Sequence, residues 1–153
     1  MTRLLIVSHS PSSNTREMTA AVLRGCSNED LSGIEVKDIR PLQAGVEDVL
    51  WAEGIILGTT ENFGYMSGAM KDFFDRIYYP CLEQTQGLPY ALFIRAGNDG
   101  LGAKSSIERI VNGLCWKQVQ SPLICTGAWQ ESFLSACEEL GLTMAAGLEA
   151  GIF

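Results

Sequence analysis

Histidines and closely spaced cysteines are almost absent from this sequence. There is one histidine, His9, and none of the five cysteines forms a C-x-x-C pair. A zinc site of the usual kind needs such pairs or clustered histidines, so we expect no metal centre. An odd number of unpaired thiols fits a reducing compartment better than a disulfide framework, and we therefore expect a cytoplasmic protein.

Long apolar runs and an excess of positive charge are also missing. The only early apolar run, Leu4 to Val7, is too short for a signal-peptide core or a membrane span. Eleven Lys and Arg stand against eighteen Asp and Glu, which gives a net charge of −7. Nucleic acids and anionic membranes are held by clustered cations, so neither is an expected partner.

What the sequence does have is the length and composition of one globular domain. Its 153 residues are 46% hydrophobic and 19% charged, as in ordinary folded chains, and they are too few for two domains of usual size. We expect a single domain over residues 1–153 that buries its own core without help from a disulfide or a metal.

Strand and helix patterns alternate along the chain. Apolar and β-branched runs predict five strands, and apolar residues at helical spacing predict four or five helices. Such alternation is typical of an α/β fold, in which a parallel sheet carries helices on both faces. Pro122 lies within the last predicted strand and indicates an edge position. The strands are expected over 3–8, 34–39, 54–59, 90–95 and 119–126, and the helices over 15–25, 46–51, 67–79, 103–115 and 130–146.

Polar loops follow three of the predicted strands, and an open parallel sheet binds ligands at such strand ends. The first loop, residues 8–15, holds four serines before a helix. Hydroxyls and free N–H groups at a helix N-terminus suit an anion, and the absence of lysine excludes a Walker-type loop. This pattern fits one phosphate monoester; an ordinary loop with an N-cap at Asn14 or Thr15 is the alternative.

The residues of the second and third loops favour the binding of a flat ring. The second, residues 59–67, places Phe63 beside Gly64 after a buried strand. A ring has room to lie against such an aromatic residue, with backbone amides at its edge, although the aromatic side chain would also serve as a cap on the core. The third loop, residues 96–100, would close the other side, although Asn-Asp-Gly is also ordinary turn chemistry.

Two stretches resemble a known family. The arrangement Ser10-x-Ser-Ser-Asn-Thr15 lies where flavodoxin-like proteins keep their FMN phosphate loop. The stretch Gly58-Thr-Thr-Glu-Asn-Phe-Gly-Tyr-Met-Ser-Gly-Ala-Met-Lys-Asp-Phe-Phe-Asp-Arg76 is similar to the G-T-P-x-Y/N-F-G-x-M-S-G-x-M/L-K-x-F-x-D-R block of the FMN reductases. The sequence thus resembles the flavodoxin-like superfamily, and within it the NAD(P)H-dependent FMN reductase and quinone reductase branch.

The resemblance implies a three-layer sandwich with a five-stranded parallel sheet in the order 2-1-3-4-5, and non-covalent FMN. It also implies hydride transfer from NAD(P)H through FMN to a quinone, a flavin or another acceptor, and names no catalytic side chain. The chain is short for this branch, so a homodimer that completes the nicotinamide pocket is one expectation. The resemblance assigns the phosphate to Ser10, Ser12, Ser13, Asn14 and Thr15, the ring edge and face to Thr59, Thr60, Glu61, Asn62, Phe63 and Gly64, and the pyrimidine side to Ala96, Gly97, Asn98, Asp99 and Gly100.

Three departures from the carrier flavodoxins bear on function. Ser13 stands where the carriers have glycine, and the third loop has no aromatic residue to stack on the flavin. An open flavin face favours hydride delivery over one-electron transfer. A carrier protein that shuttles electrons between redox partner proteins is the alternative, and a flavin-free binding module is a third possibility. The third departure is Glu61, which would either oppose negative charge on a reduced ring or lie solvated. His9 either bonds the phosphate or ribityl chain or is simply exposed.

Overall fold

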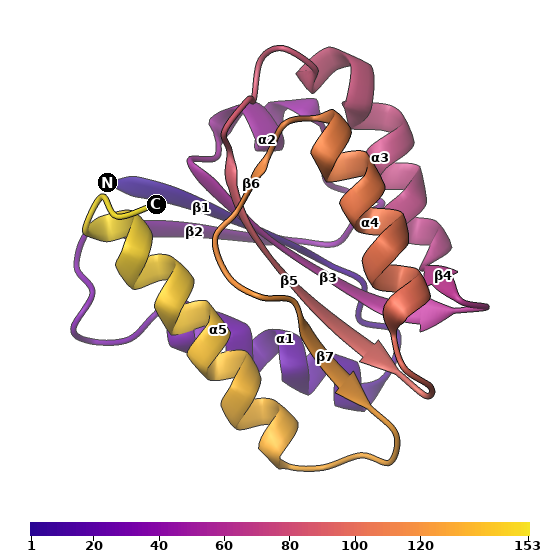
Figure 1. Ribbon diagram of the computed structural model, residues 1–153. Coiled ribbons are helices and arrows are strands. Elements are labelled where there is room, and N and C mark those ends of the chain that lie inside the picture. Colours follow the sequence, from indigo (N-terminus) through magenta and orange to yellow (C-terminus); the bar gives the residue numbers. More distant parts are fainter.

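The computed structural model describes all 153 residues as an α/β fold with a central twisted sheet (Figure 1). Its strands are β1 (Thr2–Ser8), β2 (Ile34–Ile39), β3 (Gly54–Asn62), β4 (Tyr65–Met66), β5 (Pro89–Ala96), β6 (Lys117–Gln118) and β7 (Leu123–Thr126). Its helices are α1 (Ser13–Cys26), α2 (Val46–Trp51), α3 (Gly68–Cys81), α4 (Leu101–Gly113) and α5 (Ser132–Glu149).

The parallel sheet has the strand order that the resemblance predicts. Strands β2, β1, β3 and β5 lie side by side, and β6 and β7 both pair with β5 on its outer side. The last strand predicted over residues 119–126 is wrong over its first half, because only Leu123–Thr126 is strand and a separate short strand, β6, comes before it. Ser121 and Pro122 lie between these two strands, and proline has no N–H group to donate to a sheet ladder.

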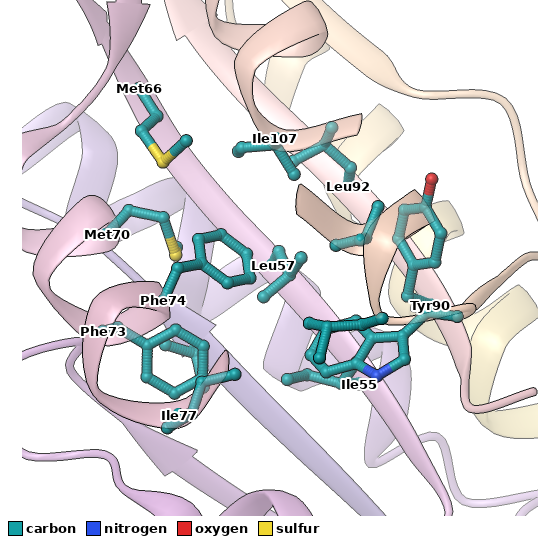
Figure 2. Packing of buried hydrophobic residues seen from close by; sticks show 14 of the residues in the cluster. Ile55, Leu57, Met66, Met70, Phe73, Phe74, Ile77, Tyr90, Leu92 and Ile107 are labelled. Atoms are coloured by element: carbon teal, nitrogen blue, oxygen red, sulfur yellow. The ribbon is translucent and has the colours of Figure 1, made fainter. Parts of the chain in front are cut away.

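The sheet separates two apolar cores because successive strand residues point to opposite faces. Leu5 and Val7 of β1 face the core under α2, α3 and α4, whereas Leu4 and Ile6 face the core under α1 and α5. Figure 2 shows the first core, in which Leu57 lies between the aromatic rings of α3 and the side chains of α4. Burial on both faces explains why the strand sequences are continuous apolar runs.

Helices α1 and α5 pack closely through two glycines. A Cβ atom on Gly25 would lie 2.0 Å from the carbonyl oxygen of Glu138, and one on Gly141 would lie 2.1 Å from that of Val22. The two backbones therefore meet directly, and a side chain at either glycine would force the helices apart.

The helix ends differ slightly from those that the sequence predicts. Helix α3 continues through Pro80 to Cys81 rather than ending near Tyr79. The side chain of Thr85 donates a hydrogen bond to the carbonyl of Cys81 (3.0 Å), which satisfies one free acceptor at this end. None of the helices is both long and apolar enough to cross a membrane.

Candidate functional site

The three polar loops lie next to one another because they follow three adjacent parallel strands. Ser8 pairs with Gly58 across β1 and β3, and Thr59 pairs with Ile94 across β3 and β5. The backbone N–H of His9 also donates to the carbonyl of Gly58 (2.9 Å), which ties the first loop to the second. The predicted site residues therefore gather at one edge of the sheet.

The first loop opens helix α1 with a reciprocal cap. Ser12 is the N-cap: its Oγ accepts from the N–H of Thr15 (3.2 Å), and Thr15 Oγ1 accepts from the N–H of Ser12 (2.9 Å). The N-cap therefore lies before Asn14 and Thr15, the two positions that the alternative predicted. These two hydroxyls serve the helix start, while Ser13 and Asn14 are exposed in the first turn, where backbone N–H groups have no helical partner.

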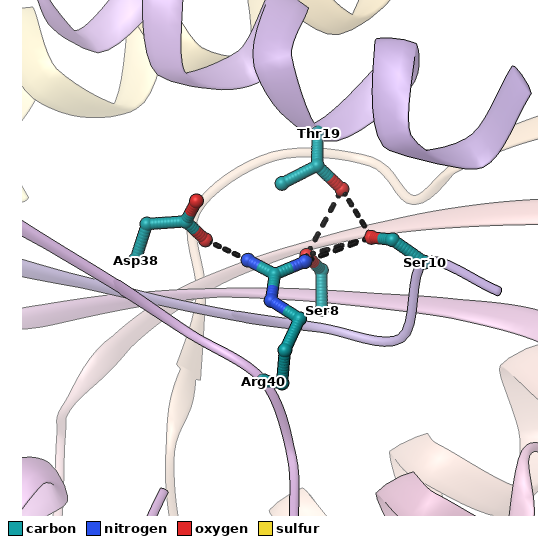
Figure 3. A network of polar contacts seen from close by, with 5 residues as sticks. All are labelled: Ser8, Ser10, Thr19, Asp38 and Arg40. Carbon is teal, nitrogen blue, oxygen red and sulfur yellow. Dashed lines mark hydrogen bonds and ion pairs between the residues drawn. The ribbon is translucent and has the colours of Figure 1, made fainter. Parts of the chain in front are cut away.

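An arginine that sequence reasoning did not single out lies beneath this loop (Figure 3). Arg40 follows β2, and its Nη1 donates to Ser8 Oγ (2.9 Å) and Ser10 Oγ (2.8 Å). Its Nη2 forms a close ion pair with Asp38. Thr19 of α1 completes the cluster, with its hydroxyl 3.0 Å from that of Ser8 and 2.8 Å from that of Ser10. The first loop thus has a cation beside its hydroxyls, although the loop itself contains none.

His9 lies half-buried next to this cluster. It lines a hollow of about 250 Å³ together with Ser10, Arg40, Pro41 and Ala69, among others. Burial lowers the pKa of His9 from its ordinary value of 6.5, and the positive charge of Arg40 lowers it further. His9 is therefore a neutral side chain at pH 7.

The lowered pKa of His9 predicts a loss of stability on mild acidification. As the pH falls through about 6.5, the unfolded chain protonates its histidine while the folded chain does not, so the unfolded state binds more protons. We expect the urea midpoint to drop between about pH 7 and 5.5, and His9→Gln to remove this drop. His9 is the only histidine. If the urea midpoint of the variant falls with pH as much as that of the wild type, His9 is not the cause of the drop.

The second loop is a β-hairpin rather than an irregular loop. Strand β3 continues to Asn62, turns through Phe63 and Gly64, and pairs antiparallel with β4, with Asn62 opposite Tyr65. Phe63 and Gly64 have φ values of +53° and +71°, the pattern of a two-residue type I′ turn. Phe63 is fully exposed at the tip. A non-glycine residue in this left-handed conformation is costly and marks a candidate binding position.

The hairpin is attached to the first turns of helix α4 by three contacts. The Glu61 carboxylate accepts from the N–H of Ala103 (3.1 Å), and Ser106 Oγ accepts from the N–H of Met66 (3.2 Å). A Cβ on Gly102 would lie 1.9 Å from the carbonyl oxygen of Gly64. Glu61 is thus neither a solvated residue nor a free charge, because it satisfies a donor at the helix N-terminus.

Thr59 and Thr60 hold the base of the hairpin. The buried Thr59 hydroxyl accepts from the N–H of Ser67 (3.0 Å) and donates to the carbonyl of Thr60 (2.8 Å). Thr60 Oγ1 donates to the Asn62 side chain (3.0 Å). These two threonines shape the loop, and its exposed surface is formed by residues 62–65.

The third loop is short and open. Ala96 is the buried last residue of β5, and Gly97, Asn98 and Asp99 are exposed. The Asp99 side chain accepts from the N–H of Leu101 (3.0 Å), and Gly100 has a φ of +72°. A Cβ on Gly97 would meet no atom within 4 Å, so the space around this glycine is open.

Several residues that build this edge escape sequence reasoning. Arg40, Asp38 and Thr19 form the cluster under the first loop, and Gly102 and Ser106 hold the hairpin. A usable signal existed for Arg40, because it directly follows the strand predicted to lie beside the first one. No local signal exists for Gly102 or Ser106, which act on a segment about 40 residues away.

Comparison with known families agrees with this geometry. The model of the NADPH-dependent FMN reductase family matches residues 2–130, which include all three loops. The chain belongs to this family. The family lies within the flavodoxin-like superfamily, as the two sequence stretches indicated.

Individual relatives of this family member are named flavodoxins. A flavodoxin of Aquifex aeolicus (strain VF5) is 32% identical over 114 residues, which are 74% of this chain and 60% of that protein. A flavodoxin structure from the domain Archaea has a TM-score of 0.81 at 22% identity over 97% of this chain and 99% of that one. A WrbA-like flavodoxin from Agrobacterium tumefaciens has a TM-score of 0.75 at 16% identity, covering 98% and 99%. The two structures establish the fold.

Proposed function

We propose that this protein binds FMN at the three loops and uses it as an NAD(P)H-dependent oxidoreductase. The first loop fits the phosphate because it combines exposed first-turn N–H groups with the hydroxyls of Ser10 and Ser13 and the amide of Asn14. Ser12 and Thr15 keep the loop in shape through their reciprocal cap. This donor set needs no lysine, since it offers many donors to one terminal phosphate.

The hairpin and the third loop are suited to the flavin ring. Asn62, Phe63 and Gly64 present an exposed rim, and the three contacts to α4 keep that rim in one position. Residues 96–100 would line the pyrimidine side. FMN held there would supply the hydride-accepting and electron-transfer chemistry, and these residues would bind and orient it.

The observation that carries the reductase assignment is the open third loop. Its exposed residues are Gly97, Asn98 and Asp99, so this loop places no aromatic side chain on the ring, and a nicotinamide would have access from that side. The acceptor would be a quinone, a flavin or a similar small molecule, and the cysteine content favours a cytoplasmic setting.

A flavodoxin-type electron carrier is the second candidate. The name of the Aquifex relative and the net charge of −7 favour it, because an acidic surface suits docking to basic redox proteins. The chain spans about 60% of that relative's length, so the activity of the whole relative is not transferred to this protein.

Anaerobic reduction distinguishes these two functions. We expect the purified protein with FMN to lose its visible flavin bands on mixing with NADPH or NADH, at a rate that supports turnover. Free FMN at the same concentration is the control for uncatalysed reduction. Flavin that stays oxidised until dithionite is added would instead indicate the carrier function. A protein that neither binds nor retains FMN would contradict both.

A further inference from the structure

We propose that Arg40 is a positioning residue of the phosphate site, because its guanidinium turns the Ser10 hydroxyl so that Ser10 donates its proton to the flavin phosphate. This inference rests on the proposed function and extends it to a residue outside the three loops. It follows from the hydrogen-bond directions that are allowed in the cluster of Ser8, Ser10, Thr19 and Arg40 (Figure 3).

Arg40 fixes which groups donate and which accept in this cluster, because a guanidinium group only donates hydrogen bonds. Arg40 Nη1 lies 2.9 Å from Ser8 Oγ and 2.8 Å from Ser10 Oγ, so both serine oxygens accept from it. The proton of each serine must then point elsewhere. On its other side the guanidinium is held by Asp38, and this ion pair keeps the planar group in place between the carboxylate and the two hydroxyls.

The remaining protons form a directed chain. Ser8 is completely buried, and its nearest hydroxyl acceptor is Thr19 Oγ1 at 3.0 Å, whereas Ser10 Oγ is 3.5 Å away. Ser8 therefore donates to Thr19, which leaves the Thr19 proton for Ser10 at 2.8 Å. Ser10 thus accepts from both Arg40 and Thr19.

The proton of Ser10 is the only one in this chain without an acceptor inside the cluster. Ser10 is half-buried and lines two hollows, one of about 250 Å³ beside Pro41 and one of about 300 Å³ beside α1. Its proton is therefore available to a ligand, and two incoming hydrogen bonds strengthen it as a donor. An anion gains most from such a donor, which identifies the phosphate as the group that Ser10 recognises.

A comparison of FMN with riboflavin tests this inference, because the two ligands differ only in the phosphate. The readout is the ratio of their dissociation constants, measured by titration of flavin fluorescence. We expect the wild type to prefer FMN, and Arg40→Met to reduce this preference about tenfold or more through FMN alone, as expected for a charge-assisted hydrogen bond. Riboflavin affinity and the thermal midpoint report whether the variant still folds. Arg109→Met makes the same charge change at an exposed position of α4 and should leave the ratio unchanged.

Two further variants separate orientation from charge. Arg40→Lys keeps the charge, but its single nitrogen cannot occupy both guanidinium positions, Nη1 beside the two hydroxyls and Nη2 beside Asp38. We therefore expect it to resemble Arg40→Met; full recovery would overturn the inference. Ser10→Ala should also lower the preference for FMN over riboflavin. The double variant Ser10→Ala with Arg40→Met should lower this preference no further than the more severe of the two single variants. Additive losses would show that Arg40 does not act through Ser10. If the wild type fails to bind FMN, the proposed function is wrong; if it binds FMN and Arg40→Met keeps the ratio, only the role of Arg40 is wrong.

Discussion

Replacing Gly141 with alanine is expected to lower the free energy of unfolding by about 3 kcal/mol, the upper end of the usual cost of overpacking. The added Cβ would lie 2.1 Å from the carbonyl oxygen of Val22. Both groups belong to helix backbones, so no side-chain rotamer can relieve the contact, and α1 and α5 must separate. The loss is measured by urea unfolding, as a lower midpoint with an unchanged dependence of the unfolding free energy on urea concentration.

The partner glycine provides an internal check on this prediction. Gly25→Ala should have a similar cost, since its Cβ would lie 2.0 Å from the carbonyl oxygen of Glu138. The double variant should cost less than the sum, because one separation of α1 from α5 relieves both contacts. Gly68→Ala is the matched control: nothing lies within 4 Å of its Cβ, and we expect a change within about 0.5 kcal/mol. If Gly141→Ala and Gly68→Ala changed the free energy of unfolding by the same amount, the close contact between α1 and α5 would be disproved.

The second large effect is expected on flavin binding, from Gly102→Ala. Its Cβ would lie 1.9 Å from the carbonyl oxygen of Gly64, well inside van der Waals contact. The hairpin would have to move away from α4, which also pulls the Glu61 carboxylate from the N–H of Ala103. Because the hairpin carries the proposed ring rim, we expect FMN affinity to fall about tenfold or more.

A matched variant on the same helix isolates this effect. Ser105→Ala lies on the exposed face of α4 and should bind FMN as the wild type does. Cooperative unfolding of Gly102→Ala should persist, because Met66 is the one hairpin residue that belongs to a core cluster. Wild-type FMN affinity in Gly102→Ala would mean that the position of the hairpin does not define the ring site.

Much of the candidate site was predictable because it follows from strand order. Once the sheet is parallel with adjacent strands β1, β3 and β5, the loops that follow them must meet at one edge. The hairpin within residues 59–67 was not predicted, because its central Phe-Gly pair lacks the usual Asn-Gly signal of such turns. The roles of individual hydroxyls were not predictable either: Ser12 and Thr15 look like Ser10 and Ser13 in the sequence, yet they cap the helix.

By itself, the sequence determined the α/β class, the apolar faces of the helices, the positions of strands β1, β2, β3 and β5, and the family, since each depends on periodicity or on a contiguous stretch. The tertiary structure alone decided that Arg40 lies under the first loop, that Glu61 accepts a hydrogen bond from Ala103 of α4, and that the hairpin is attached to that helix. These contacts join residues that are 30 to 42 positions apart. Local patterns contain no information on such pairs, because the packing of the sheet and helices decides which distant polar groups come within hydrogen-bond distance.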